Sequence, residues 1–167
     1  MTEAVLFYLF SLVAIVAGFS VVLAKNPIAS ALSLVVCFFF LAANYVLLSA
    51  HFVAVIQLLV YAGAIMVLFI FVIMVLNLRH EVPTPILELS RRGLLGMVIA
   101  GILGTGLIIA LQSLPVTEPA ALPDGYGEVA AIGTSIFSGA YLLPFEAISV
   151  LLTVALVGAV VLAKREI

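Results

Sequence analysis

The polar residues with the most capacity for chemistry lie inside an apolar run, Phe52 to Leu78, that carries no formal charge. Gln57 and Tyr61 are four positions apart, so both side chains can face one side of a helix. The small residues Ala62-Gly63-Ala64 follow directly. An amide and a phenol at this spacing can face a hydrated proton path, or they can hydrogen-bond a neighbouring helix at about 0.6 kcal/mol per contact. Both interpretations stay open for Gln57. The first is favoured for Tyr61, because polar groups inside membranes are costly.

The chain offers few other groups for catalysis or cofactor binding. Its single cysteine, Cys37, excludes an internal disulfide framework and a cysteine-ligated iron–sulfur cluster. Its two histidines, His51 and His80, both fall at expected helix ends, which argues against a haem held by two histidines of this chain. The sequence has no glycine-rich phosphate loop, metal-ligand spacing or nucleophile–base set. We therefore expect the chain to have no catalytic centre, cofactor site or metal site of its own.

The composition indicates the medium in which these residues must be positioned. The chain is 66% hydrophobic and 8% charged, with a mean hydropathy of +1.46. A water-soluble domain of 167 residues cannot hide so much apolar surface, so we expect lipid to be the solvent. The run from Phe52 to Leu78 exceeds the about 20 helical residues needed to cross a bilayer core of about 30 Å.

Hydropathy predicts an all-α integral membrane protein with five transmembrane helices in a single membrane domain, residues 1–167. We expect Asn26 to cap the second span, with Pro27 at its first helical position. The first span has no basic residue before its apolar core and is long enough to cross, so we expect a retained helix rather than a signal peptide. The predicted spans are 4–23, 27–48, 52–78, 93–111 and 144–163.

The positive charges predict the orientation of these spans. With five spans, all six lysines and arginines fall on one side. The positive-inside rule then places the N-terminus outside and the C-terminus in the cytoplasm. The opposite side holds the long loop 112–143, in which prolines and glycines exclude regular structure in the first half. The second half, Glu128 to Phe137, is expected to form a short helix or turn on the outer surface. The basic residues are Lys25, Arg79, Arg91, Arg92, Lys164 and Arg165.

Glu146 is the only acid predicted inside a membrane helix. It follows Pro144 by two residues, so we expect it in the first turn of the fifth span, where a carboxylate complements the helix dipole. Proton handling near the outer surface is the alternative, and the dipole interpretation is favoured. We expect His51 and His80 to be loop residues at the membrane interface.

Small residues recur at every fourth position in three spans, a spacing that lets helix backbones approach closely in lipid. Packing against other subunits and packing within the chain are equally compatible with this pattern. The three sets are Ala29, Ser33 and Cys37; Gly96, Ala100 and Gly104; and Ala155, Ala159 and Ala163.

Several segments resemble one family of membrane proteins. The third span contains VYAGAIMVLFIFVIMVLNL, Val60 to Leu78, which is similar to the third helix of the J subunit of bacterial respiratory complex I. This family includes mitochondrial subunit 6 of NADH:quinone oxidoreductase. The start of its second helix resembles NPIASALSLV, Asn26 to Val35, and its fifth helix resembles LLPFEAISVLLTVALVGAVVLAKRE, Leu142 to Glu166. The short turn before that helix matches IGTSIF, Ile132 to Phe137. The resemblance covers essentially the whole chain, and some family members have a glutamate where this chain has Gln57.

The resemblance implies a non-redox membrane subunit of a proton pump, which couples quinone reduction to proton translocation. NADH, flavin, iron–sulfur clusters and quinone are then expected on partner subunits. The implied partners are the quinone-site subunit, a small K-type subunit and the antiporter-like subunits, together with lipid and no nucleic acid. The implied location is a bacterial plasma membrane. The lack of a transit peptide fits bacteria, and an organelle-encoded origin stays open. An equivalent subunit of a related photosynthetic or hydrogenase-linked complex is an alternative. A free-standing small transporter is disfavoured, because no inverted repeat is visible.

The resemblance also implies a π-bulge, a single wide turn, around Gly63 to Leu68 of the third span. Such turns often lie at functional sites. A switch between bulged and regular winding would turn one half of the span against the other. We expect Gly63 to permit this wide turn rather than only close packing. Met66 and Val67 are expected to line the site as gate-like packing residues.

Overall fold

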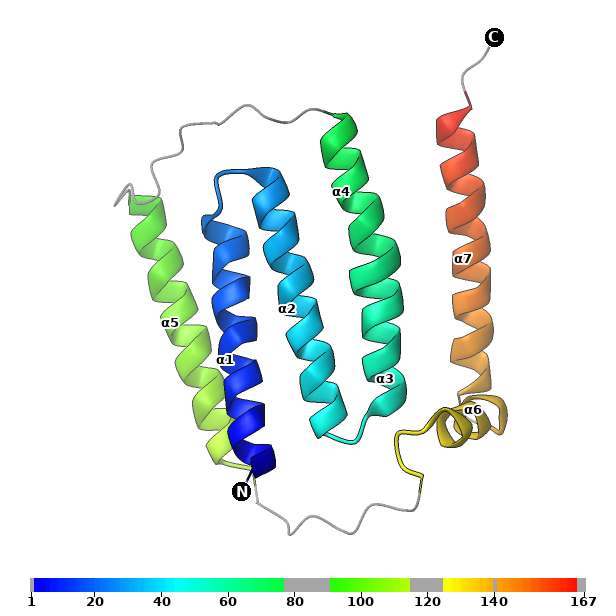
Figure 1. Ribbon diagram of the computed structural model, residues 1–167, viewed down its shortest axis with the longest axis horizontal. Helices are drawn as coiled ribbons and strands as arrows, with labels where there is room; N and C mark the ends of the chain where they lie inside the picture. The colour runs from blue at the N-terminus through cyan, green and yellow to red at the C-terminus, as the bar shows by residue number, and fades with distance from the viewer. Residues whose placement is uncertain (1, 77–90, 115–124, 140, 165–167) are drawn as a thin grey trace.

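The computed structural model describes residues 2–76, 91–114, 125–139 and 141–164 (Figure 1). These residues are helical, with short turns and no strand. The elements in chain order are α1 Thr2–Leu23, α2 Pro27–Leu47, α3 His51–Ile56, the π-helix η1 Gln57–Ile65, α4 Met66–Val75, α5 Arg91–Gln112, α6 Val129–Phe137 and α7 Leu142–Ala163.

The predicted all-α architecture with five transmembrane helices is confirmed. Elements α3, η1 and α4 continue into one another as a single span, His51–Val75, and we call this the third span. Within the described ranges, four further helices are long and apolar enough to cross a membrane. They are Thr2–Leu23, Pro27–Leu47, Leu94–Gln112 and Leu142–Ala163.

The helix ends follow the local sequence. The Asn26 side chain accepts a hydrogen bond of 2.9 Å from the amide of Ile28, and Pro27 is the first residue of α2, as predicted. The fifth span begins at Leu142 rather than at Pro144. Proline is tolerated there because the amides of the first helical turn need no partner within the helix. The predicted end of the third span, at Leu78, lies outside the described residues.

Helices α1 and α2 and the third span form the packed part of the molecule, which we call the three-span group (Figure 1). Its buried apolar residues are mostly alanines, which allow close helix approach. A small core between α2 and α4 consists of Ala31, Met66 and Ile73. It is surrounded by partly buried residues, namely Ile28, Leu34, Val35, Phe38 and Ile70. In the predicted small-residue seam of α2, Ala29 is exposed, whereas Ser33 and Cys37 are partly buried.

Helices α5 and α7 stand apart from the three-span group, on opposite sides of it (Figure 1). Among the described residues, α5 packs on no other helix and α7 contacts only α6. The small residues of both helices are open: a Cβ added at Gly96, Gly104 or Gly158 would meet nothing within 4 Å. These faces therefore do not serve packing within the described chain. A helix that is apolar all round suits lipid or a neighbouring membrane helix.

The short helix α6 lies at the end of the bundle where α2 ends and the third span begins (Figure 1). Its bounds agree with the predicted segment from Glu128 to Phe137. The Phe137 ring packs edge to face on Phe145 of α7, with ring centroids 5.0 Å apart. The first half of the long loop, residues 115–124, lies outside the described residues.

Candidate functional site

The site is built on the unusual winding of the third span. Residues Gln57 to Ile65 form a π-helix, and the amide of Met66 bonds the carbonyl of Tyr61, five residues earlier. The wide winding thus begins earlier than the predicted Gly63 to Leu68, and Val67 and Leu68 are α-helical. A Cβ on Gly63 would lie 3.2 Å from the Leu58 carbonyl oxygen. Because Gly63 has no Cβ, the carbonyl of Leu58, five residues earlier, can approach it closely. Most of the wide turns accordingly lie on the N-terminal side of Gly63.

The winding decides which side chains of the third span are buried. The buried residues are Ala54, Gln57, Met66 and Ile73. At roughly 4.4 residues per turn, the step from Gln57 to Met66 makes about two full turns of a π-helix and returns to the same face. At about 3.6 residues per turn, the same step in an α-helix makes about two and a half turns and reaches the opposite face. The π winding therefore places Gln57, at the N-terminal end of η1, and Met66, a core residue after its C-terminal end, on the same packed face.

Gln57 is the polar group on this face. It is 9% exposed, and only Asn44 is a comparably buried polar residue among the described ones. Its amide can donate two hydrogen bonds and accept others. A buried amide in a membrane span needs such partners, because lipid supplies none.

Tyr61 lies at the edge of the same face. Its ring packs edge to face on Phe38 of α2, with centroids 5.7 Å apart and an interplanar angle of 75°. The residue remains 46% exposed. Phe38 also packs against the Ala31, Met66 and Ile73 core, so the tyrosine ring is joined to this core through Phe38.

Of the two residues predicted to line the site, Met66 is buried and Val67 is exposed. Met66 is 3% exposed and belongs to the core. Val67 is 63% exposed, so it forms no gate-like packing among the residues that the structure describes.

Glu146 is not in the first turn of α7, which contains no acidic residue, because the helix begins at Leu142. The predicted dipole contact of a first-turn carboxylate is therefore wrong. Glu146 is exposed, and its backbone carbonyl accepts a 2.7 Å hydrogen bond from Ser149. Since α7 contacts only α6 among the described elements, the structure does not bring Glu146 to η1.

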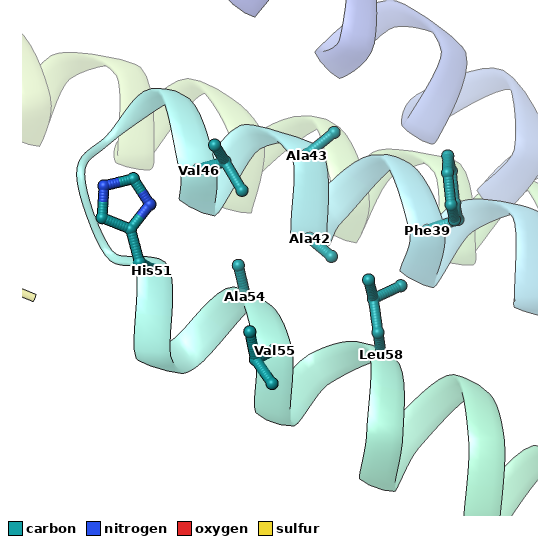
Figure 2. Close-up of a pocket in the computed structure, with 8 residues that line it drawn as sticks. All are labelled: Phe39, Ala42, Ala43, Val46, His51, Ala54, Val55 and Leu58. Carbon is teal, nitrogen blue, oxygen red and sulfur yellow. The ribbon is translucent and has the colours of Figure 1, made fainter. Parts of the chain in front are cut away.

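His51 is the exposed first residue of α3 rather than a loop residue, whereas His80 lies outside the described residues. His51 stands at one end of an apolar pocket of about 320 Å³ between α2 and the third span (Figure 2). Within the described residues, no group of three or more histidine, cysteine, aspartate or glutamate residues could hold a metal ion. The pocket is lined by Phe39, Ala42, Ala43, Val46, His51, Ala54, Val55 and Leu58.

One buried polar contact was not predicted. The Asn44 side chain of α2 donates a 3.2 Å hydrogen bond to the Ser11 hydroxyl of α1. Its Oδ1 atom is buried without a partner among the described residues. The available signal was an asparagine inside the apolar second span, since such residues are costly unless they are paired.

Comparison with known proteins identifies the family. The model of the family "NADH-ubiquinone/plastoquinone oxidoreductase chain 6" matches residues 17–162, a range that includes η1. The chain belongs to this family. The predicted resemblance to the J subunit, or subunit 6, is thereby confirmed.

The chain 6 family includes relatives from several kinds of organism. The chain is 37% identical to the NADH-quinone oxidoreductase subunit J of Rhodobacter capsulatus, over 96% of this chain and 81% of that protein. It is 40% identical to the NAD(P)H-quinone oxidoreductase chain 6 of a Nostoc species, over 87% and 71%. It is 33% identical to the F(420)H(2) dehydrogenase subunit J of Methanosarcina mazei, over 98% and 92%.

Proposed function

We propose that this chain is a non-redox membrane subunit of a proton-translocating NADH:quinone oxidoreductase, and that η1 couples quinone reduction to proton translocation. The observation that carries the proposal is the π-helix of 9 residues with Gln57 buried at its start. Both π winding and buried amides are uncommon in membrane spans and often mark functional positions. Plain anchoring in lipid requires neither.

The coupling follows from the two faces of the third span. When η1 is π-helical, Gln57 and Met66 share the face that packs on α2. A return to α winding turns one half of the span by roughly 160° relative to the other, because the nine residues then make about two and a half turns instead of about two. One of the two residues then leaves the face. The face beside a water chain then keeps or loses its pairing of a hydrogen-bonding amide with the apolar bulk of Met66, and proton passage changes with it.

The roles of the side chains follow from their chemistry. The Gln57 amide carries no proton to release, so it orients water rather than transferring charge. The Tyr61 hydroxyl can donate and accept, and it extends the hydrogen-bonding surface by one turn. Met66 closes the face with apolar bulk, and Gly63 leaves room for the displaced carbonyl of Leu58.

The remaining parts of the proposal concern the assembly. NADH, flavin, iron–sulfur clusters and quinone bind partner subunits, and this chain is held among the quinone-site, K-type and antiporter-like subunits of a bacterial plasma membrane. The N-terminus faces outward, as the distribution of lysine and arginine predicts. The open faces of α5 and α7 support burial among neighbouring membrane helices.

A second candidate is the equivalent subunit of a complex with a different electron donor. The specific observation in its favour is the 33% identity to a subunit named for F(420)H(2) dehydrogenase. Mass spectrometry of the native complex separates the two candidates, because only the first predicts flavin- and iron–sulfur-carrying partners that oxidise NADH.

The test of the proposed function is deletion of this chain followed by separate assays of the two halves of the reaction. NADH oxidation with an artificial hydrophilic acceptor should persist, while quinone reduction coupled to proton translocation should be lost. Re-expression of the chain should restore quinone reduction and the proton translocation coupled to it. The proposal is wrong if coupled translocation survives the deletion, or if the purified chain contains its own flavin or haem.

A further inference from the structure

The turn before α6 is joined, backbone to backbone, to the start of the third span. The amide of Phe52 donates a 2.9 Å hydrogen bond to the carbonyl of Gly127. A Cβ at Gly127 would overlap the carbonyl oxygen of Ser49 and lie 3.1 Å from the Cα atom of Ala50. Gly127 also has a φ of 76°, in the left-handed region that glycine tolerates best. We call this arrangement the Gly127 contact, and only glycine fits it.

The Gly127 contact replaces a helix cap. The first amides of a helix have no partner within the helix. Ala50 precedes α3 and provides no side-chain cap. The carbonyl of Gly127 takes the place of that cap, so the first turn of the third span depends on residues far along the chain.

The same turn is also tied to α2. The amide of Ala50 bonds the carbonyl of Tyr45 at 2.9 Å, and the amide of Ser49 bonds the carbonyl of Val46 at 3.0 Å. Ser49 has a φ of 58°, which is uncommon for a residue other than glycine. The beginning of the third span is therefore held from two sides, by α2 and by the turn before α6.

The contact lies at a structural junction. Among the described elements, α6 contacts α3, and α7 contacts only α6. Movement of the first turn of the third span would thus displace α6 and, through the Phe137–Phe145 ring contact, α7. Both the short α2–α3 turn and these helices oppose rotation of α3.

We propose that Gly127 is a positioning residue that holds the first turn of the third span at a fixed rotation while the winding of η1 changes. This inference rests on the proposed function, because it names the stationary end of the span whose rewinding would couple the two reactions. Without a stationary end, a change of winding would be spread over both halves, and neither Gln57 nor Met66 would leave the packed face completely.

The test compares Gly127→Ala with Gly125→Ala in the assembled complex. Both glycines have a φ of 76°, so alanine meets the same left-handed backbone strain at either position. A Cβ at Gly125 would meet only the Glu128 carboxylate, at 3.6 Å, whereas a Cβ at Gly127 must displace backbone. The two variants therefore differ in the contact itself.

Two measurements are needed. Hydrogen exchange with residue resolution should show a protected Phe52 amide in the wild type and in Gly125→Ala, and at least tenfold faster exchange in Gly127→Ala. Protons translocated per NADH oxidised should fall by half or more in Gly127→Ala alone. A merely structural role would lower the amount of assembled complex and leave that ratio unchanged in the complexes that form.

A second pair of variants covers failure of Gly127→Ala to assemble. Phe52→Pro removes the donating amide in the first helical turn, where proline is tolerated, and Phe52→Ala removes the ring but keeps the amide. The ratio should fall further in Phe52→Pro than in Phe52→Ala.

Equal ratios in the Phe52 pair overturn the inference, as does an unchanged ratio in assembled Gly127→Ala or unchanged exchange of the Phe52 amide. The proposed function then stands or falls separately, because its own tests are deletion of the chain and substitution of Gly63.

Discussion

Gln57 is the first residue of η1 and Met66 directly follows its last, and both are buried on one face of the third span, with 9% and 3% of their surface exposed. In a regular α-helix the same two residues would point in opposite directions. Their common face is thus a consequence of the π winding. Any change in that winding must move either a polar amide or part of the apolar core, which gives the third span two distinguishable states.

The orientation of the chain can be tested with fused reporters. Reporters placed after Lys25, Arg91 and Arg165 should report the cytoplasm, because all lysines and arginines are predicted on that side. Reporters inserted between Pro119 and Gly127 should report the outer side. A cytoplasmic signal from the 119–127 loop would contradict the predicted orientation.

The core contribution of the third span can be tested with a pair of adjacent residues. Met66→Ala should destabilise the three-span group by about 2 kcal/mol, near the lower limit for large-to-small core substitutions, since lipid rather than water surrounds the group. Val67→Ala should have little effect, because Val67 is 63% exposed. Unfolding of the chain in mixed micelles with a denaturing detergent measures both. Equal destabilisation by the two substitutions would show that the buried face is assigned wrongly.

Much of the fold could be predicted because lipid imposes simple requirements on length and polarity. The five spans, the Asn26 cap and the short α6 all follow from features local in the sequence. The start of α7 was harder to predict from the sequence, since proline fits several positions of a first turn. That small shift moved Glu146 out of the turn in which its charge would meet the helix dipole.

The site could be predicted only in part, because its decisive feature depends on contacts between spans. Gln57, Tyr61 and Gly63 stood out as polar or small residues in an apolar run. The position of the π winding depends on where the Leu58 carbonyl finds room and on packing against α2, which the local sequence does not report. The Asn44–Ser11 bond and the Gly127 contact each join distant parts of the chain, so no local pattern predicted either pairing.

The Tyr61 hydroxyl can be tested by Tyr61→Phe, which removes the hydroxyl and retains the ring on Phe38. We expect coupled quinone reduction to slow roughly threefold, corresponding to about 0.6 kcal/mol for one hydrogen bond between membrane helices. Tyr61→Leu, which also removes the edge-to-face contact, should slow it further. The role assigned to the hydroxyl is wrong if Tyr61→Phe retains the full wild-type rate of assembled complex.

The Gln57 amide can be tested by comparing an apolar and a polar replacement. Gln57→Leu should assemble normally, since it removes a costly buried amide, yet it should lower proton translocation about tenfold, or about 1.4 kcal/mol on the barrier. Gln57→Glu keeps a hydrogen-bonding group of similar size and should retain most of the translocation. Proton uptake by vesicles containing the assembled complex measures both variants. If Gln57→Leu translocated protons at the wild-type rate, the amide would have no role in translocation and would serve only in packing.

The most direct measurement is the rate of quinone reduction and of proton translocation in assembled Gly63→Val complex. A Cβ added at position 63 would lie 3.2 Å from the Leu58 carbonyl oxygen, and the branched side chain of valine would restrict the winding further. Gly18→Val is the control, because a Cβ at Gly18 meets nothing within 4 Å. We predict that both rates fall together by about tenfold in Gly63→Val, equivalent to about 1.4 kcal/mol, and stay near wild type in Gly18→Val. Wild-type rates of both reactions in assembled Gly63→Val would contradict the coupling role of η1 and reduce the third span to a packing element.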